Sequence, residues 1–96
     1  MLSHELEALS ADDRKALARE AWEVRDYAQV RQIADMLNRD GKGEAVGSED
    51  MALSAALEDE GGVVHHVGSD GVVYGRLYSR IVVVMDVNGP WAITID

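Results

Sequence analysis

A run of five apolar residues near the C-terminus, residues 81–85, constrains the fold more than any other stretch of this chain. Four of the five are β-branched, and β-branched side chains favour an extended strand over a helix. Because no polar residue interrupts the run, this strand is expected to be covered on both faces. The helix-forming N-terminal half is the available cover. The sequence therefore predicts an α+β fold in which helices pack on one face of a small antiparallel sheet.

The segment after residue 60 is predicted to form an antiparallel meander of three to four strands. The expected strands are residues 63–67, 72–78, 80–87 and 91–95, with the boundaries within residues 75–80 left open. Gly75 is expected to mark a bulge or a bend. Asn88-Gly89 is the strongest hairpin signal in the chain. Apolar side chains alternate from Trp91 to Ile95, which predicts a last strand that has one buried face and lies at the edge of the sheet.

Two capping patterns predict a helical hairpin in the N-terminal half. Ser10 is followed three residues later by Asp13, and Asp26 is followed three residues later by Gln29. In each pair the first side chain can accept a hydrogen bond from a free amide in the first turn of a helix. The chain is expected to form a single domain over residues 1–96, with residues 1–60 mainly helical and residues 61–96 forming the sheet.

A third helix is predicted over residues 48–60, with Ser48 as its N-cap, after a glycine-rich stretch at residues 42–47 that predicts a mobile loop. Acids lie at both ends of this helix. The helix dipole favours acids in the first turn and disfavours them in the last turn. We predict that these acids bind a partner, and the alternative is a solvated face that only keeps the protein soluble. The acids are Glu49, Asp50, Glu58, Asp59 and Glu60.

A second candidate surface lies on the strand predicted over residues 72–78. Tyr74, Arg76 and Tyr78 share one face of that strand if the register is regular. Tyrosine and arginine are enriched at protein-binding hot spots, so these residues are predicted to contact a partner. The alternative is that they form cross-strand pairs on a solvated face of the sheet.

Composition and charge limit the classes of function. The chain has no cysteine, which excludes disulfides and thiolate zinc sites. Its formal net charge of −9 repels phosphate backbones and anionic lipid, and attracts basic proteins. No basic and apolar leader and no run of about 20 apolar residues is present, so a cytoplasmic location is expected.

No catalytic, cofactor-binding or metal-ligating residue is predicted. His65 and His66 are adjacent on a predicted strand, where neighbouring side chains point to opposite faces and cannot share one ion without distortion. Ser69 and Asp86 could complete a Ser-His-Asp triplet, but no Gly-x-Ser-x-Gly turn accompanies them. We therefore do not expect an enzyme.

Three functions are compatible with this sequence. In size and charge the chain is similar to small acidic inhibitors of nucleic-acid-handling machines, a class that includes anti-CRISPR, anti-restriction, DNA-mimic and immunity proteins, although no motif carries this similarity. Such a module would bind a basic protein or a nucleoprotein complex. The first alternative is a winged-helix-like DNA-binding regulator, which the acids of the third helix disfavour. The second is a self-assembling structural or phage accessory protein that forms a homodimer through the edge strand from Trp91 to Ile95.

Overall fold

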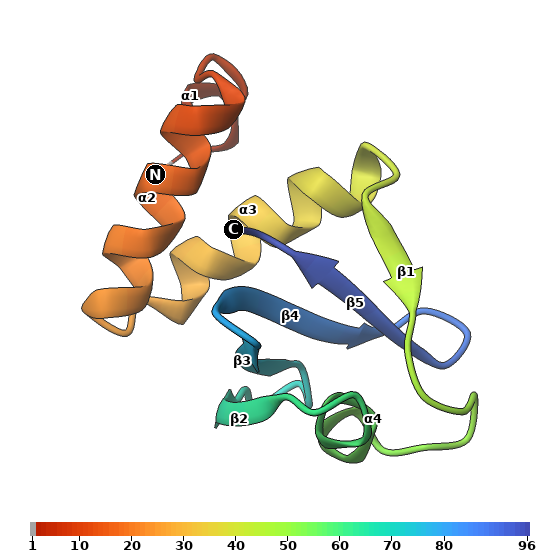
Figure 1. Ribbon diagram of the computed structural model, residues 1–96. Helices are drawn as coiled ribbons and strands as arrows, with labels where there is room; N and C mark the ends of the chain where they lie inside the picture. Colours follow the sequence, from red (N-terminus) through yellow and green to blue (C-terminus); the bar gives the residue numbers. More distant parts are fainter. Residues whose placement is uncertain (1) are drawn as a thin grey trace.

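A computed structural model describes residues 2–96 and shows a five-stranded sheet between two helical layers (Figure 1). The predicted α+β class is confirmed. The elements found in these residues are, in chain order, α1 (Ser3–Glu7), α2 (Ala11–Glu23), α3 (Tyr27–Arg39), β1 (Gly43–Ala45), α4 (Leu53–Asp59), β2 (Val63–Val67), β3 (Val73–Leu77), β4 (Arg80–Asp86) and β5 (Pro90–Thr94).

The sheet is antiparallel throughout, in the order β1-β5-β4-β3-β2. The predicted meander is confirmed, because β2 to β5 are joined in sequence order. Tyr78 and Ser79 form the two-residue turn between β3 and β4. Asn88 and Gly89 turn the chain between β4 and β5, both with positive φ (55° and 104°). The Gly89 amide also donates to Asp86 Oδ1 at 3.0 Å, which closes this turn.

The fifth strand comes from the stretch that was predicted to be a mobile loop. Gly43 pairs with Ile93 and Ala45 pairs with Trp91, so β1 covers the outer side of β5. A three-residue strand is too short to show alternation, which is why the sequence pattern did not reveal it. The prediction that β5 is an edge strand is therefore wrong. A homodimer built through that strand has no open edge to pair with, because β5 has a neighbour on each side.

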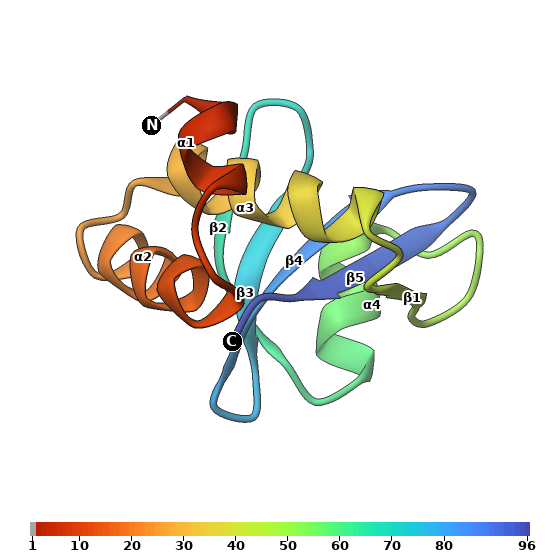
Figure 2. The same cartoon turned by 90° about the horizontal axis from the view of Figure 1, so that it is seen from above.

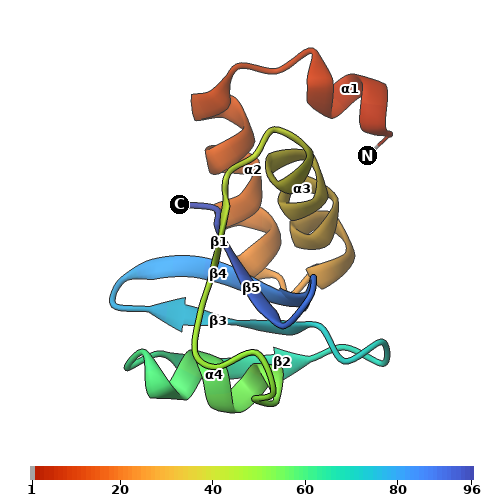
Figure 3. The same cartoon turned by 90° about the vertical axis from the view of Figure 1, so that its right-hand side faces the viewer.

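The helices cover both faces of the sheet rather than one, as Figure 3 shows. The β4 side chains Ile81 and Val83 pack in a core with the α1–α3 layer. The intervening Val82 and Val84 pack in a second core with α4. All four are buried, so the prediction that this strand is covered on both faces is confirmed. The prediction that all helices share one face is wrong, because a second apolar face requires its own cover.

Both predicted caps of the helical hairpin are confirmed. Ser10 Oγ accepts from the Asp13 amide at 3.2 Å at the start of α2. Asp26 Oδ1 accepts from the Gln29 amide at 3.2 Å at the start of α3. The hairpin lies on the sheet with α3 running across the strands (Figure 2). Within residues 2–96, no helix has the length and apolar character needed to cross a bilayer.

The third predicted helix is shorter than expected and begins later. Its first residue is Leu53, and Ala52 rather than Ser48 is the N-cap residue. Ser48 instead begins a turn in which its carbonyl accepts from the Met51 amide at 3.0 Å. Gly47 precedes this turn with a φ of 63°. The N-cap prediction at Ser48 is wrong because residues 48–51 form a separate turn, and the backbone is extended at Ala52, with a ψ of 148°, before the helix begins.

Candidate functional site

The acidic residues predicted to bind a partner lie on the α4 side of the sheet, and all five are exposed. We call this set the acidic surface: Glu49, Asp50, Glu58, Asp59 and Glu60. Glu49 and Asp50 belong to the turn before α4, whereas the other three lie at the C-terminal end of the helix. The set therefore occupies two positions beside α4 rather than one.

Contacts with neighbouring loops locate both positions. Glu60 Oε1 accepts from the Gly47 amide at 3.5 Å, which links the end of α4 to the loop before it. Glu49 lies against the β4–β5 turn, where a Cβ added to Gly89 would be 3.0 Å from the Glu49 Cα. The acids thus flank α4 along one side of the molecule.

The chain segment that carries the acidic surface has charged groups of a single sign. Residues 43–75 contain seven Asp and Glu residues and no Lys or Arg, and they account for −7 of the net charge of −9. Asp70 is the member of this group that forms an ion pair, with Arg31. Within residues 2–96, no basic side chain lies within 4.0 Å of any carboxylate of the acidic surface. These carboxylates are therefore available to a partner.

The helix dipole acts on only one part of this surface. No acid lies in the first turn of α4, so the predicted favourable placement of Glu49 and Asp50 is wrong. Glu58, Asp59 and Glu60 do lie at the C-terminal end, as predicted. An acid at this end costs about 0.3–1 kcal/mol at low salt when exposed. The free protein therefore carries an unfavourable arrangement of charge at the end of α4.

Tyr74 and Arg76 share one face of β3, as predicted, but the helical hairpin covers this face and Tyr78 lies outside the strand. Tyr74 is 5% exposed and lies under α3, with its ring 5.1 Å from that of Tyr27. Arg76 is half-buried over Trp22, at 5.6 Å from the ring. Tyr78 is 85% exposed in the β3–β4 turn and has a φ of 59°.

The separation of Tyr78 from the other two residues has a simple cause. The two-residue turn ends β3 at Leu77, so Tyr78 falls outside the alternation of the strand. The face that carries Tyr74 is covered by the helical hairpin, which also contradicts the solvated-face alternative for that residue. Burial raises the pKa of the Tyr74 phenol, so this side chain stays neutral at physiological pH.

A bulge in β2 brings both histidines to the same side of the sheet. Val64 pairs with Gly75 and His66 pairs with the adjacent Tyr74, so His65 is an extra residue in the ladder. The His66 ring stacks on Tyr27 at 4.2 Å, and the His65 ring lies 5.3 Å from Trp22. The prediction that the two rings point to opposite faces is wrong, because a bulge breaks the period of two. The bulge predicted at Gly75 lies instead in the partner strand.

The histidines belong to an aromatic cluster formed by Trp22, Tyr27, His65, His66 and Tyr74. Both imidazole rings are at its exposed edge. Among the residues the structure describes, no group of three or more His, Cys, Asp and Glu side chains is placed to hold a metal ion. The contacts of His65 with Trp22 and of His66 with Tyr27 join β2 to the helical hairpin.

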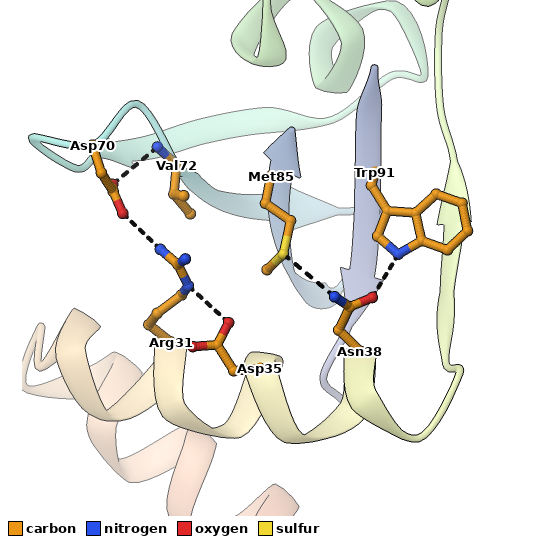
Figure 4. A network of polar contacts seen from close by, with 7 residues as sticks. All are labelled: Arg31, Asp35, Asn38, Asp70, Val72, Met85 and Trp91. Atoms are coloured by element: carbon orange, nitrogen blue, oxygen red, sulfur yellow. Dashed lines mark hydrogen bonds and ion pairs between the residues drawn. The ribbon is translucent and has the colours of Figure 1, made fainter. Parts of the chain in front are cut away.

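Two polar side chains of α3 that sequence reasoning missed hold the helix to the sheet (Figure 4). Asn38 Oδ1 accepts from Trp91 Nε1 at 2.9 Å, and Asn38 Nδ2 lies 4.0 Å from Met85 Sδ. At the other end of α3, Arg31 donates to Asp70 Oδ2 at 2.7 Å. No sequence signal could have revealed these pairs, because their members are separated by 39 to 53 residues.

The charge state of the Arg31 contact is secure. Burial lowers the pKa of the Arg31 guanidinium, but hydrogen bonds to Asp35 and Asp70 outweigh burial and leave its pKa raised. The hydrogen bond from Arg31 lowers the pKa of the Asp70 carboxyl, and a second bond from the Val72 amide acts in the same direction. Both partners are therefore charged at neutral pH.

Comparison with protein-family models, with curated proteins and with solved structures gives no match for this chain.

Proposed function

We propose that this protein is a non-catalytic binding module that docks its acidic surface on a basic surface of another protein. One observation supports this most strongly. The segment of residues 43–75, which contains β1, α4 and β2, has seven acids and no Lys or Arg. An exposed field of one sign attracts a partner of opposite sign and accelerates its association.

The partner class that fits this field is a nucleic-acid-handling protein. Such proteins bind phosphate backbones through lysine and arginine surfaces. Exposed carboxylates that flank a helix can occupy the same basic surface and exclude the nucleic acid. The protein would then act as an inhibitor or regulator of the anti-CRISPR, anti-restriction or immunity type.

The end of α4 supplies a thermodynamic reason for binding. The three acids there lie at the negative end of the helix dipole, and no cation offsets them within residues 2–96. A basic partner would remove this cost of about 0.3–1 kcal/mol for each exposed acid. Relief of the repulsion would favour the complex over the free protein.

The test compares two triple charge reversals that change the net charge equally. E58K/D59K/E60K alters the acidic surface, and E5K/E20K/E23K alters three exposed acids of α1 and α2. Each tagged protein is used to capture partners from a lysate of the source organism at low and at high salt. The captured protein is identified by mass spectrometry and purified, and its Kd is then measured by calorimetry.

We expect the wild type and E5K/E20K/E23K to capture the same basic protein at low salt and to lose it at high salt. E58K/D59K/E60K should raise the Kd by at least about tenfold. Circular dichroism checks that both variants are folded. An unchanged Kd for E58K/D59K/E60K, or capture of no basic protein by the wild type, would contradict the proposed function.

A further inference from the structure

A pocket of about 480 Å³ lies on the side of the sheet that carries α1–α3, between the start of α2, the C-terminal half of α3 and the last residues of the chain. Its apolar floor is aliphatic. Ile33 and Ile95 are 1% and 2% exposed, and Leu37 is partly buried beside them. This volume falls within the range of about 300–1,000 Å³ that is usual for pockets that bind small molecules.

Four of the nine basic residues of this acidic chain line the pocket: Arg14, Lys15, Lys42 and Arg80. They come from the first turns of α2, the residue before β1 and the first residue of β4, and the fold alone brings them together. Within residues 2–96, none of the four has an acidic group within 4.0 Å. The ion pairs found within residues 2–96 are formed by other cations, namely Arg19, Arg31 and Arg39.

The acid that lines the pocket is already neutralised. Asp96 Oδ2 and Oδ1 accept from Arg19 Nε and Nη2 at 2.7 Å and 3.2 Å. The hydrogen bonds from Arg19 lower the pKa of the Asp96 carboxyl, so this pair remains ionised at neutral pH. The Asp96 carboxylate is therefore paired mainly with Arg19. Among the four lining cations, Lys15 adds a weaker charge interaction with it, and within residues 2–96 none of the four forms an ion pair with it.

One of the cations is held in position by the backbone. Arg14 Nε donates to the Leu6 carbonyl at 2.8 Å, and Arg14 Nη2 donates to the Glu7 carbonyl at 3.0 Å. These bonds use two of the five N–H donors of the guanidinium. The remaining donors keep a fixed orientation, which favours recognition of a carboxylate or phosphate.

We infer that this pocket binds a small organic anion that has a carboxylate or phosphate head and an aliphatic body. The rim supplies positive charge for the head, and the floor of isoleucine and leucine buries the body. Among the residues that the structure describes, no aromatic side chain lines the pocket, so a stacked nucleobase is disfavoured. An extended polyanion is disfavoured too, because the rest of the protein repels it. This inference is independent of the proposed function.

The test is a titration of the full chain with octanoate and octyl phosphate, followed by calorimetry and by amide chemical shifts in NMR. Acetate carries the charge without the body, and 1-octanol carries the body without the charge. We expect saturable binding of octanoate or octyl phosphate, with amide shifts at Lys42, Thr94 and Ile95. Acetate and 1-octanol should each bind at least about tenfold more weakly, because each lacks one of the two contributions.

Two double variants that change charge equally show whether the pocket is responsible. K42Q/R80Q removes two lining cations, and R25Q/R39Q removes two exposed cations that do not line the pocket. K42Q/R80Q should weaken octanoate binding by at least about tenfold, and R25Q/R39Q should leave it unchanged. Equal affinities for the two variants, equal affinities for octanoate and 1-octanol, or no saturable binding to the wild type would each overturn the inference.

Vesicles distinguish the two sources of such an anion. The head belongs to an anionic lipid if the wild type co-sediments with phosphatidylglycerol vesicles but not with phosphatidylcholine vesicles, and if K42Q/R80Q abolishes this co-sedimentation. Saturable octanoate or octyl phosphate binding without co-sedimentation would assign it to a soluble molecule. Absence of both would overturn the inference.

Discussion

At the scale of single residues, Gly75 of β3 sets how closely the neighbouring strand β2 and the helix α4 approach β3. It lies in the middle of β3, pairs with Val82 and is buried. A Cβ at this position would collide with the Val63 carbonyl of β2 and would lie 2.6 Å from Leu57 Cδ2 of α4. The glycine is therefore required by close backbone approach rather than by an unusual φ.

Gly75→Ala should lower the free energy of unfolding by about 1–3 kcal/mol, because overpacking of a buried site forces the backbone to shift. Urea denaturation followed by circular dichroism measures this change. Gly68→Ala is the control, since its added Cβ would meet a side-chain oxygen, Asp70 Oδ1, at 2.8 Å, and the Val72 carbonyl oxygen of the backbone is 3.6 Å away. We expect the control to cost less than Gly75→Ala. Equal losses in the two variants would show that close approach at Gly75 is not the cause.

At the scale of elements, polar contacts fix α3 to the sheet at both of its ends. Asn38 reaches Trp91 of β5 near the C-terminal end, and Arg31 reaches Asp70 in the β2–β3 turn (Figure 4). The Asp70 carboxylate also accepts from the Val72 amide at 3.2 Å, which orients it within the turn. The Arg31–Asp70 pair is expected to make the stability of the protein depend on acid pH.

The sign of this dependence follows from the direction of the pKa shift. The contact with Arg31 depresses the folded-state pKa of Asp70 below its ordinary value of 3.8. Its stabilisation is therefore fully present above that value and is lost as the pH falls through the lower, folded-state pKa. Asp70→Asn should be less stable than the wild type at pH 7, and the difference should shrink as the pH drops below 3.8.

Thermal unfolding of both proteins at a series of pH values measures this difference. Asp40→Asn provides the control, because Asp40 is exposed and forms no ion pair within residues 2–96. The control is not expected to lower stability at pH 7. A gap between Asp70→Asn and the wild type that stays constant down to the acid transition would contradict the role assigned to the ion pair.

At the scale of the whole molecule, charge is separated between two sides of the fold. The segment of residues 43–75, which includes α4, has seven acids and no Lys or Arg. In contrast, four of the nine basic residues line one pocket on the α1–α3 side of the sheet. Like charges around α4 repel one another across the surface. This repulsion lowers the stability of the folded state and is screened by salt.

Added sodium chloride should therefore raise the Tm. Between about 0.01 M and about 1 M salt the Debye length falls from about 30 Å to about 3 Å, which removes most of the repulsion. E58Q/D59N/E60Q should raise the Tm at low salt and reduce its dependence on salt, because it removes acids from the unfavourable end of α4. Scanning calorimetry tests both effects. A Tm that falls with salt in the wild type would contradict this account.

What could be predicted from the sequence is what depends on neighbouring residues. The caps at Ser10 and Asp26 and the hairpin at Asn88 and Gly89 are local, because each involves side chains or dihedral angles within about three residues. The apolar run at residues 81–85 also predicted burial on both faces, since a strand without polar residues needs a cover on each face. The sequence also predicted part of the acidic surface correctly, because three of its five acids lie at the predicted end of the helix.

The tertiary structure decided the features that depend on distant contacts. β1 is a strand only because β5 lies beside it, and the β2 bulge turns both histidines toward the helical hairpin. The split of Tyr74 from Tyr78 depended on where one turn ended. The four cations of the pocket come from three separate segments, so no local pattern could predict that they meet. Sequence thus determined most of the elements and the two buried faces of β4, while packing across the chain decided β1 and which charges and rings became neighbours.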